Sequence, residues 1–254
     1  MPYTIAVAGK GGTGKTTLCG FLIDWLVKHG RKPVLAVDAD ANSNLNEVLG
    51  VEAPVSLGDI REEVAHAEES GAVPAGMSTQ DYMEFRFNSA LEEEDDFDML
   101  VMGRTQGKGC YCFVNGLLQT QLQKFSGSYQ YVVVDNEAGM EHISRGLLPA
   151  VDVLLLVSDC SRRGIQAVGR ITALARELNL NPKYLKLIVN RAPSTELAPG
   201  ILEEIEKQGL DLLGVVPQDE NIFACDSEGK PTALLPSDSP ARAAFEKLLP
   251  AVLP

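Results

Sequence analysis

Short apolar segments alternate along the chain with longer segments in which apolar residues recur every three or four positions. This alternation predicts βαβ units, in which helices join parallel strands. The expected strands are nearly continuous runs of Val, Ile and Leu, so both faces of the sheet should be covered. These strands are Tyr3–Ala8, Pro33–Val37, Phe97–Met102, Tyr131–Val134, Val153–Val157, Leu185–Val189 and Leu212–Val215. The expected helices are Lys15–Lys28, Gly116–Phe125, Ser161–Leu178, Pro199–Gln208 and Ala241–Leu249.

The pattern therefore predicts a single α/β domain over residues 1–254. Its mainly parallel, twisted sheet should have about seven or eight strands, flanked by helices on both faces. One segment, residues 51–96, shows no clear period and carries acidic clusters at Glu62–Glu63, Glu68–Glu69 and Glu92–Asp96. It is interpreted as a solvated helical insertion, and the alternative is a docking face for a partner.

Composition and charge narrow the function classes. Hydrophobic residues make up 45% and charged residues 22%, which is ordinary for a globular protein. No run approaches the ~20 apolar residues needed to cross a bilayer, and the first residues lack the basic region of a signal peptide. The net charge of −13 argues against nucleic acid and anionic lipid as partners. A cytoplasmic protein without membrane or nucleic-acid contacts is expected.

Residues 9–16 read Gly-Lys-Gly-Gly-Thr-Gly-Lys-Thr and match the full phosphate-loop pattern between an expected strand and helix. Glycines allow backbone N–H groups to surround phosphates, and the helix N-terminus adds the positive end of its dipole. Lys15 is expected to reach the β- and γ-phosphates, and the Thr16 hydroxyl to bind magnesium. The predicted nucleotide-binding residues of this loop are Gly9, Gly11, Gly12, Thr13, Gly14, Lys15, Thr16 and Thr17.

Carboxylates follow two of the expected strands. Asp38 and Asp40 stand at the end of the second strand, and Asp135 ends a run of four apolar residues, which is the Walker B pattern. Ligands of open α/β sheets bind at this edge. Asp135 is expected to hold magnesium through water. Asp40 could alternatively cap a helix over residues 43–49.

A second lysine, Lys10, follows the first glycine of the loop. With the carboxylates above, the sequence resembles the deviant-Walker ATPase family of MinD, ParA, ArsA and the nitrogenase iron protein over nearly the whole chain. The resemblance implies a homodimer that hydrolyses ATP to ADP and phosphate, with Lys10 reaching the partner's nucleotide. It also implies catalytic roles for Lys10, Lys15 and Asp40, of which Asp40 orients or deprotonates the attacking water, while Asp38 supports the magnesium shell.

Two further segments resemble elements of that family. Residues 136–142, Asn-Glu-Ala-Gly-Met-Glu-His, resemble its second switch, with Gly139 as the hinge that senses the γ-phosphate. Asn136 and Glu137 depart from the Thr-Pro or Met-Gly usual there. Asn190 stands where the family reads the adenine edge, which implies ATP rather than GTP. An Asn at a strand end is also a common turn residue.

The pair Cys110 and Cys112 is a candidate metal site in a glycine-rich loop. Two thiolates cannot complete a tetrahedral or square-planar site, so a two-fold dimer is expected to supply the other two. The alternative is two ordinary cysteines, one of them buried. Cys19, Cys160 and Cys225 show no ligand spacing and are expected to be structural.

This Cys-x-Cys pair, placed before the second switch, resembles the CooC type of nickel-insertion ATPase and the related AcsF type. The resemblance implies a metallochaperone that inserts Ni²⁺ into carbon monoxide dehydrogenase or acetyl-CoA synthase. Nickel or zinc would bind Cys110 and Cys112 across the dimer, and ATP would control dimerisation. The alternatives are an ATPase with a bridging Fe–S cluster, for electron transfer or as a cluster scaffold, and a spatial organiser like MinD or ParA.

Overall fold

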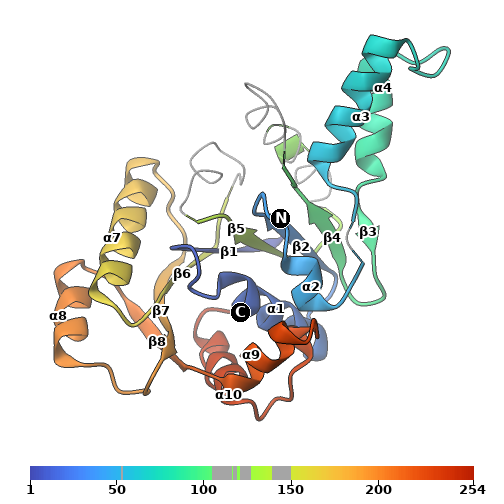
Figure 1. Cartoon of the computed structure of the whole chain (residues 1–254). Coiled ribbons are helices and arrows are strands. Elements are labelled where there is room, and N and C mark those ends of the chain that lie inside the picture. The colour runs from blue at the N-terminus through green and yellow to red at the C-terminus, as the bar shows by residue number, and fades with distance from the viewer. Residues whose placement is uncertain (53, 105–115, 117–118, 121–126, 139–149) are drawn as a thin grey trace.

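The computed structural model describes residues 1–52, 54–104, 116, 119–120, 127–138 and 150–254. Within these residues, eight strands form one sheet in the order β3-β4-β2-β5-β1-β6-β7-β8 (Figure 1). All neighbouring strands are parallel except the pair β3 and β4. The predicted mainly parallel α/β sheet is therefore confirmed. The strands are β1 (Tyr3–Gly9), β2 (Val34–Ala39), β3 (Glu92–Glu93), β4 (Asp98–Val101), β5 (Tyr131–Asn136), β6 (Val153–Ser158), β7 (Tyr184–Ala192) and β8 (Leu212–Pro217).

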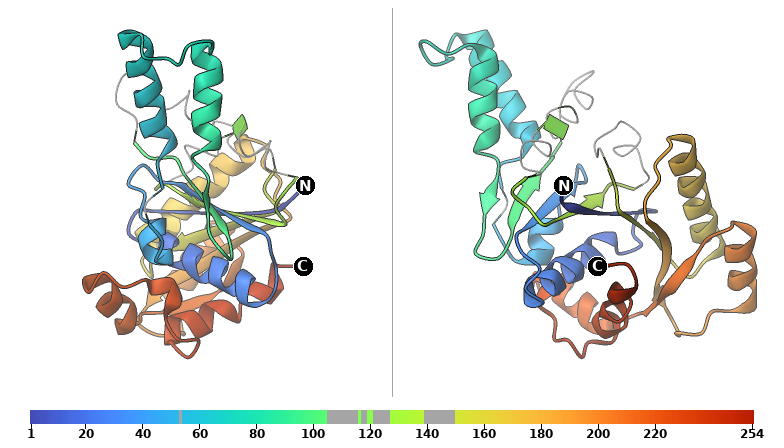
Figure 2. Two further views of the ribbon diagram at one scale, coloured as in Figure 1. Left: turned by 90° about the vertical axis from the view of Figure 1, so that its right-hand side faces the viewer. Right: turned by 180° about the vertical axis from the view of Figure 1, so that it is seen from behind.

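Helices cover both faces of this sheet, as Figure 2 shows from two further sides. The α-helices of the described residues are α1 (Lys15–Lys28), α2 (Leu45–Leu49), α3 (Leu57–Ser70), α4 (Thr79–Asn88), α7 (Arg162–Glu177), α8 (Pro199–Lys207), α9 (Glu220–Ser227) and α10 (Pro240–Glu246). Alternation along each strand sends side chains to opposite cores. In β1, Ile5 and Val7 pack with α1 and α10, whereas Ala6 and Ala8 face the core that contains α7 and α8. The central strands β1, β2, β5 and β6 are buried on both sides, which explains their nearly uninterrupted apolar sequences.

Several element ends differ from the sequence prediction. The strand expected to end at Val37 continues to Ala39, so Asp38 lies inside β2. The helix expected over Ala241–Leu249 ends at Glu246, because Pro250 cannot donate a backbone hydrogen bond and its ring crowds the carbonyl four residues earlier. Strand β3 and helix α9 were not predicted. The helix expected over Gly116–Phe125 lies almost wholly outside the described residues.

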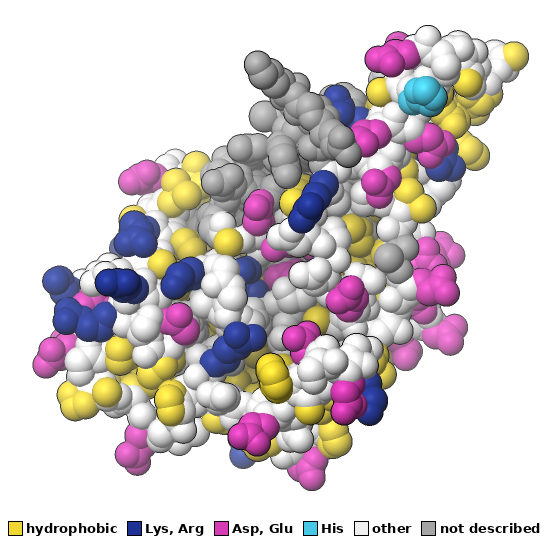
Figure 3. Space-filling view, viewed as in Figure 1, with side chains coloured by type: hydrophobic (Ala, Val, Ile, Leu, Met, Phe, Trp, Pro, Cys, Tyr) yellow, Lys and Arg dark blue, Asp and Glu magenta, His cyan; other side chains and the backbone are white. Residues whose placement is uncertain are grey.

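Between β2 and β4 the chain builds a helical hairpin from α3 and α4, which projects from the body of the molecule (Figures 1 and 2). Each helix begins with a capping box, formed by Ser56 and Asp59 in α3 and by Ser78 and Asp81 in α4. The face seen in Figure 3 carries a group of acidic side chains near β3, below this hairpin. No helix among the described residues is long and apolar enough to cross a membrane.

Candidate functional site

The phosphate-loop motif lies at the carboxyl edge of the sheet, around the turn from β1 to α1. Gly9 ends β1, the loop contains Gly11, Gly12, Thr13 and Gly14, and Lys15, Thr16 and Thr17 begin α1. The first residue of the motif, Gly9, passes so close to β6 that a Cβ atom there would lie 2.1 Å from the Val157 carbonyl oxygen. Gly14, directly before α1, has a φ angle of +85°, a left-handed value that favours glycine. The loop path therefore requires glycine at both positions, independently of any ligand.

The two lysines of the loop have different environments. Lys15 is buried, and its Nζ lies 3.4 Å from the Lys10 carbonyl oxygen, which also accepts a 2.9 Å hydrogen bond from the Thr13 hydroxyl. The Lys10 side chain is exposed. Lys15 is thus held inside the loop, whereas Lys10 is free to contact a second molecule.

Strand β7 braces the phosphate loop from the neighbouring part of the sheet. The Asn190 amide donates a 2.8 Å hydrogen bond to the Thr13 carbonyl, and Arg191 donates a 2.9 Å bond to the Gly12 carbonyl. Asn190 is a buried residue within β7 and not a turn residue. Its amide nitrogen therefore holds the phosphate loop in place through the Thr13 carbonyl.

Asp38 and Asp135 are register partners on the adjacent strands β2 and β5, and both are fully buried. The pKa of Asp135 is raised to about 7, chiefly by burial and also by the charges of Asp38 and Asp40. A hydrogen bond from Thr16 and the charge of Lys15 partly oppose this increase. Burial likewise raises the pKa of Asp38 to about 6. Two carboxyl groups are therefore held together in a place where ionisation is costly without a cation.

The Oδ1 atom of Asp135 is buried without a hydrogen-bond partner among the described residues. The Thr16 hydroxyl hydrogen-bonds to the same carboxyl group. A buried, unsatisfied carboxylate oxygen beside a hydroxyl fits a hydrated Mg²⁺, which prefers oxygen ligands and retains several waters. The residues present therefore suit the ion that the phosphate-loop motif requires.

Asp38 organises the loop that follows β2. Its two carboxylate oxygens accept backbone hydrogen bonds of 3.0 Å from Asp40 and from Leu45, the first residue of α2. The helix-terminal contact considered for Asp40 is thus made by Asp38. Asp40 is half-buried, and its Oδ1 accepts hydrogen bonds from the backbone and side chain of Asn42, at 2.8 and 3.1 Å.

The same loop contacts the end of β4. Arg104 donates a hydrogen bond to the side-chain oxygen of Asn42. A cavity of about 280 Å³ lies beside this contact, between the loop and the start of α3. Arg104 directly precedes residues 105–115, and Cys110 and Cys112 lie outside the described residues, as does Gly139. Within the described part of the chain, no three His, Cys, Asp or Glu side chains gather as metal ligands.

Asn136 follows Asp135 in β5 and is fully buried. Its amide nitrogen donates a 2.9 Å hydrogen bond to the Val7 carbonyl of β1, and its Oδ1 has no partner among the described residues. Asn136, which departs from the usual sequence of the family's second switch, therefore places a polar side chain between β5, the Walker B strand, and β1, which leads into the phosphate loop. This contact could not be predicted from the sequence.

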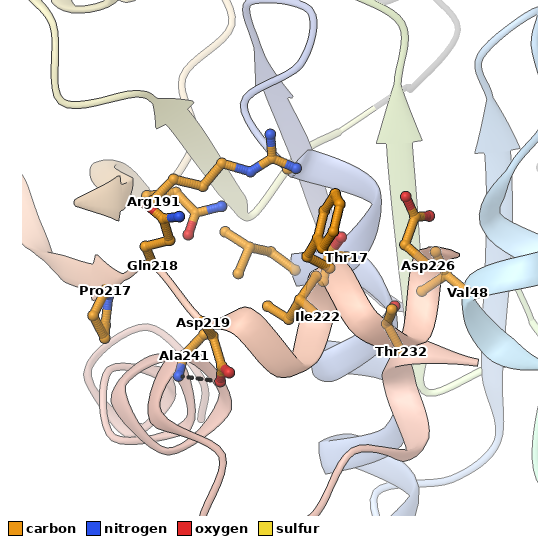
Figure 4. A pocket seen from close by; sticks show the side chains of 14 residues that line it. Thr17, Val48, Arg191, Pro217, Gln218, Asp219, Ile222, Asp226, Thr232 and Ala241 are labelled. Carbon is orange, nitrogen blue, oxygen red and sulfur yellow. Dashed lines mark hydrogen bonds between the residues drawn. The ribbon is translucent and has the colours of Figure 1, made fainter. Parts of the chain in front are cut away.

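A second cavity, of about 310 Å³, adjoins the phosphate loop at Gly14 and Thr17 (Figure 4). Among the residues that β7, β8 and α9 contribute to this cavity, only Asn190 was predicted as a site residue from the sequence. The others include Arg191, Pro217, Gln218, Asp219, Ile222 and Phe223. Asp219 accepts backbone hydrogen bonds from Asn221 at 3.0 Å and Ala241 at 3.1 Å, and so joins α9 to α10. An Asp shortly after an apolar strand is a helix-cap signal that could have revealed this wall.

The cysteines outside residues 105–115 fit the structural role expected for them. Cys19 is fully buried in α1, and its burial and the nearby Asp135 raise the pKa of its thiol well above the usual value. Cys160 and Cys225 are half-buried. None of the three forms a disulfide.

A glycine loop between a strand and a helix, a buried lysine, two register-paired aspartates and an adjoining cavity define a P-loop nucleotide-binding protein. Residues 4–232 match the CobQ/CobB/MinD/ParA nucleotide binding domain. The chain belongs to that family.

Individual relatives agree with this assignment. The chain is 40% identical to an uncharacterized ATP-binding protein of Methanocaldococcus jannaschii, over 92% of each chain. It is 34% identical to the carbon monoxide dehydrogenase accessory protein CooC of Rhodospirillum rubrum, over 89% of this chain and 87% of that protein. The fold is that of MinD from Pyrococcus horikoshii, whose structure was solved in complex with Mg-ADP. The TM-score is 0.71 and the identity 23%, over 99% of this chain and 96% of that chain.

Proposed function

We propose that the protein is a homodimeric ATPase that delivers nickel to carbon monoxide dehydrogenase or acetyl-CoA synthase. The observation that carries this proposal is the similarity to CooC, at 34% identity over 89% of the chain, in a sequence that contains the pair Cys110 and Cys112. The wider family supports ATP binding, and the CooC similarity supports the nickel cargo. Reduced thiols and ATP are both present in the cytoplasm, where this function would place the protein.

Hydrolysis would use the residues at the carboxyl edge of the sheet. Lys15 would neutralise charge on the β- and γ-phosphates, and the exposed Lys10 would reach the nucleotide of the partner subunit. Asp40 would orient the attacking water and accept its proton. Mg²⁺, held by Thr16 and through water by Asp135, would offset the phosphate charge. The buried Asp38 would hold the Asp40 loop through its two backbone hydrogen bonds.

The cavity between β7 and α9 is proposed as the base pocket. It adjoins the phosphate loop through Gly14 and Thr17, which is where a nucleotide bound by that loop would extend its ribose and base. The side-chain amide nitrogen of Asn190 donates a hydrogen bond to the Thr13 carbonyl. The side-chain oxygen of Asn190 would therefore accept a hydrogen bond from the adenine amino group. Phe223, an exposed aromatic side chain at the rim, would cover the base.

Nickel would be cargo held by Cys110 and Cys112 of both subunits. ATP binding would draw the subunits together through Lys10, and the separation of the four thiolates would follow the nucleotide state. Changing a metal site from almost full to almost empty requires about 5.5 kcal/mol of differential affinity. Hydrolysis of ATP is the step proposed to supply it.

The test is an anaerobic nickel titration of the purified dimer in the presence of ADP or ATP. The wild type should bind one nickel per dimer with a nucleotide-dependent affinity, and Cys110→Ser/Cys112→Ser should lose this binding. The matched control is Cys160→Ser/Cys225→Ser, which changes two half-buried cysteines and should behave as wild type. Nickel binding that survives in the Cys110→Ser/Cys112→Ser variant would refute the thiolate site.

A further inference from the structure

The α3–α4 hairpin exposes apolar side chains that the fold itself does not use. Of residues 79–88, which form α4, only Phe87 is buried. Phe85 is 55% exposed, and Met77, just before the helix, is 41% exposed. Isolated exposed apolar residues are common. Here they are grouped, because Figure 3 shows hydrophobic side chains gathered along the outer edge of this projection.

Contacts between α3 and α4 hold the two helices of the hairpin together. Arg86 of α4 forms an ion pair of 2.6 Å with Glu63 of α3, and Tyr82 donates a 3.1 Å hydrogen bond to the same carboxylate. Ile60 and Val64 anchor α3 in the main core. Since a preformed surface loses little conformational entropy on binding, this hairpin is suited to recognition.

The base of the hairpin lies against the chain that leads to the cysteine pair. The Gly58 amide donates a 3.0 Å hydrogen bond to the Met102 carbonyl. A Cβ atom at Gly58 would lie 2.1 Å from the Arg104 carbonyl oxygen, so α3 starts in direct contact with the end of β4. A protein seated on the base of the hairpin would therefore stand beside Arg104, the last described residue before the cysteine pair.

Charge identifies the kind of partner. Residues 57–98 contain thirteen Asp and Glu side chains against two basic ones, Arg61 and Arg86, so they carry −11 of the chain's net −13. This excess repels nucleic acid and anionic lipid. It also disfavours a second copy of the chain, because a two-fold contact would place like charges together. A basic protein surface is complementary.

We infer that the α3–α4 hairpin and β3 dock the client enzyme, with Phe85 and Met77 entering an apolar pocket on a basic face of that enzyme. This inference rests on the proposed function in one respect, since it takes the nickel enzyme as the occupant. The apolar side chains provide the anchor, as aromatic residues do at the centre of interfaces. The surrounding acidic side chains provide steering and orientation.

The experiment measures binding of the full-length protein to purified nickel-free carbon monoxide dehydrogenase and acetyl-CoA synthase. Phe85→Ala and Glu68→Lys/Glu69→Lys should each weaken binding to the client about tenfold or more. The wild-type affinity should fall with rising salt, and less steeply in the Glu68→Lys/Glu69→Lys variant. ATP affinity and helix content, which should be unchanged, show that each variant is folded.

Matched controls lie on α8, at the other end of the sheet. Leu202→Ala removes an apolar side chain that is 47% exposed, and Glu203→Lys/Glu206→Lys reverses two exposed charges. These variants should change client affinity by less than about twofold. Equal losses in the hairpin and α8 variants would overturn the inference.

Two other results would also overturn it. If the wild type binds neither purified client, the occupant is wrong, and the nickel titration, which needs no client, then decides separately whether the proposed metal function stands. If Phe85→Ala instead abolishes the ATP-dependent dimer, as judged from its mass in solution, the hairpin contacts a second copy of the chain.

Discussion

The Arg104 guanidinium donates a hydrogen bond to the side-chain oxygen of Asn42, across the gap between β4 and the loop after β2. Asn42 in turn donates two hydrogen bonds to the carboxylate of Asp40. The group proposed to activate water is thus two hydrogen bonds away from Arg104, the last described residue before Cys110 in the sequence. A shift of the Asp40 loop on hydrolysis would move Arg104 with it.

This contact leads to a prediction about coupling. Arg104→Ala should retain ATP affinity within about twofold, because Arg104 is not among the residues of the phosphate loop or its adjoining cavity. The difference in nickel affinity between the ADP and ATP states should shrink about fivefold or more. Nickel titration in each nucleotide state measures this difference. The control is Arg163→Ala on the exposed face of α7. An undiminished difference in Arg104→Ala would exclude this coupling path.

The two loop lysines should separate binding from dimer chemistry. Lys10→Ala should bind ATP within about threefold of wild type, since its side chain is exposed in the single subunit. It should lose ATP-dependent dimerisation, and its rate of ATP hydrolysis should fall about 100-fold or more. Losses of this size are typical when a cationic side chain that a partner contributes to the nucleotide is removed. Lys15→Ala should lose nucleotide affinity itself. Solution mass and phosphate release measure the two effects, and wild-type hydrolysis by a monomeric Lys10→Ala protein would contradict the prediction.

Asp135 should make the nucleotide-free protein sensitive to pH. Its pKa in the folded protein is raised from 3.8 to about 7, chiefly by burial. Between these two pKa values the folded state binds more protons than the unfolded state. The contribution of Asp135 to the unfolding free energy is therefore fully present below pH ~4 and is lost as the pH rises to about 7. Unfolding free energies from urea titrations between pH 4 and 8 should fall with pH, and Asp135→Asn should flatten this dependence.

Magnesium should reverse this trend, because a bound cation favours the ionised carboxylate. The affinity for Mg-ADP should therefore rise between pH 6 and 8 in the wild type. Asp135→Asn should lower that affinity about tenfold or more and remove most of its pH dependence. A pH-independent affinity in the wild type would show that Asp135 does not titrate in this range.

The sequence predicted the parts of the site that are local in the chain. The phosphate loop is one segment in which Gly9 and Gly14 are required by the path of the backbone, and Asp135 lies in β5 directly after its apolar run. The cavity beside Asn190 was missed because its walls come from β7, β8 and α9 and meet only in the folded sheet. The division of roles between Asp38 and Asp40 also depended on tertiary structure, because the backbone N–H of Leu45 returns to Asp38 seven residues later in the chain.

A stability prediction concerns Arg242 of α10, which is almost fully buried. It donates hydrogen bonds of 2.6 Å to the carbonyls of Ala233 and Leu235, and forms an ion pair with Asp24 of α1. Arg242→Met should lower the unfolding free energy by about 3 kcal/mol, because it leaves buried acceptors unpaired.

The matched control for Arg242→Met uses the same carboxylate. Lys28 forms an ion pair of 2.8 Å with Asp24, but its side chain is 56% exposed. Lys28→Met should therefore cost less than about 1 kcal/mol. Urea denaturation of both variants measures the contrast, and equal losses would indicate that burial does not determine the contribution of each pair.

The hydrogen bonds from Asn190 and Arg191 to the Thr13 and Gly12 carbonyls have a consequence for the thermodynamics of nucleotide binding. They fix the conformation of the phosphate loop in the free protein, so that little backbone entropy remains to be lost when phosphates arrive. Asn190 and Arg191 of β7 would thereby contribute to phosphate affinity through the unbound state. The core sheet acts as a template that holds the loop in one conformation before a nucleotide binds.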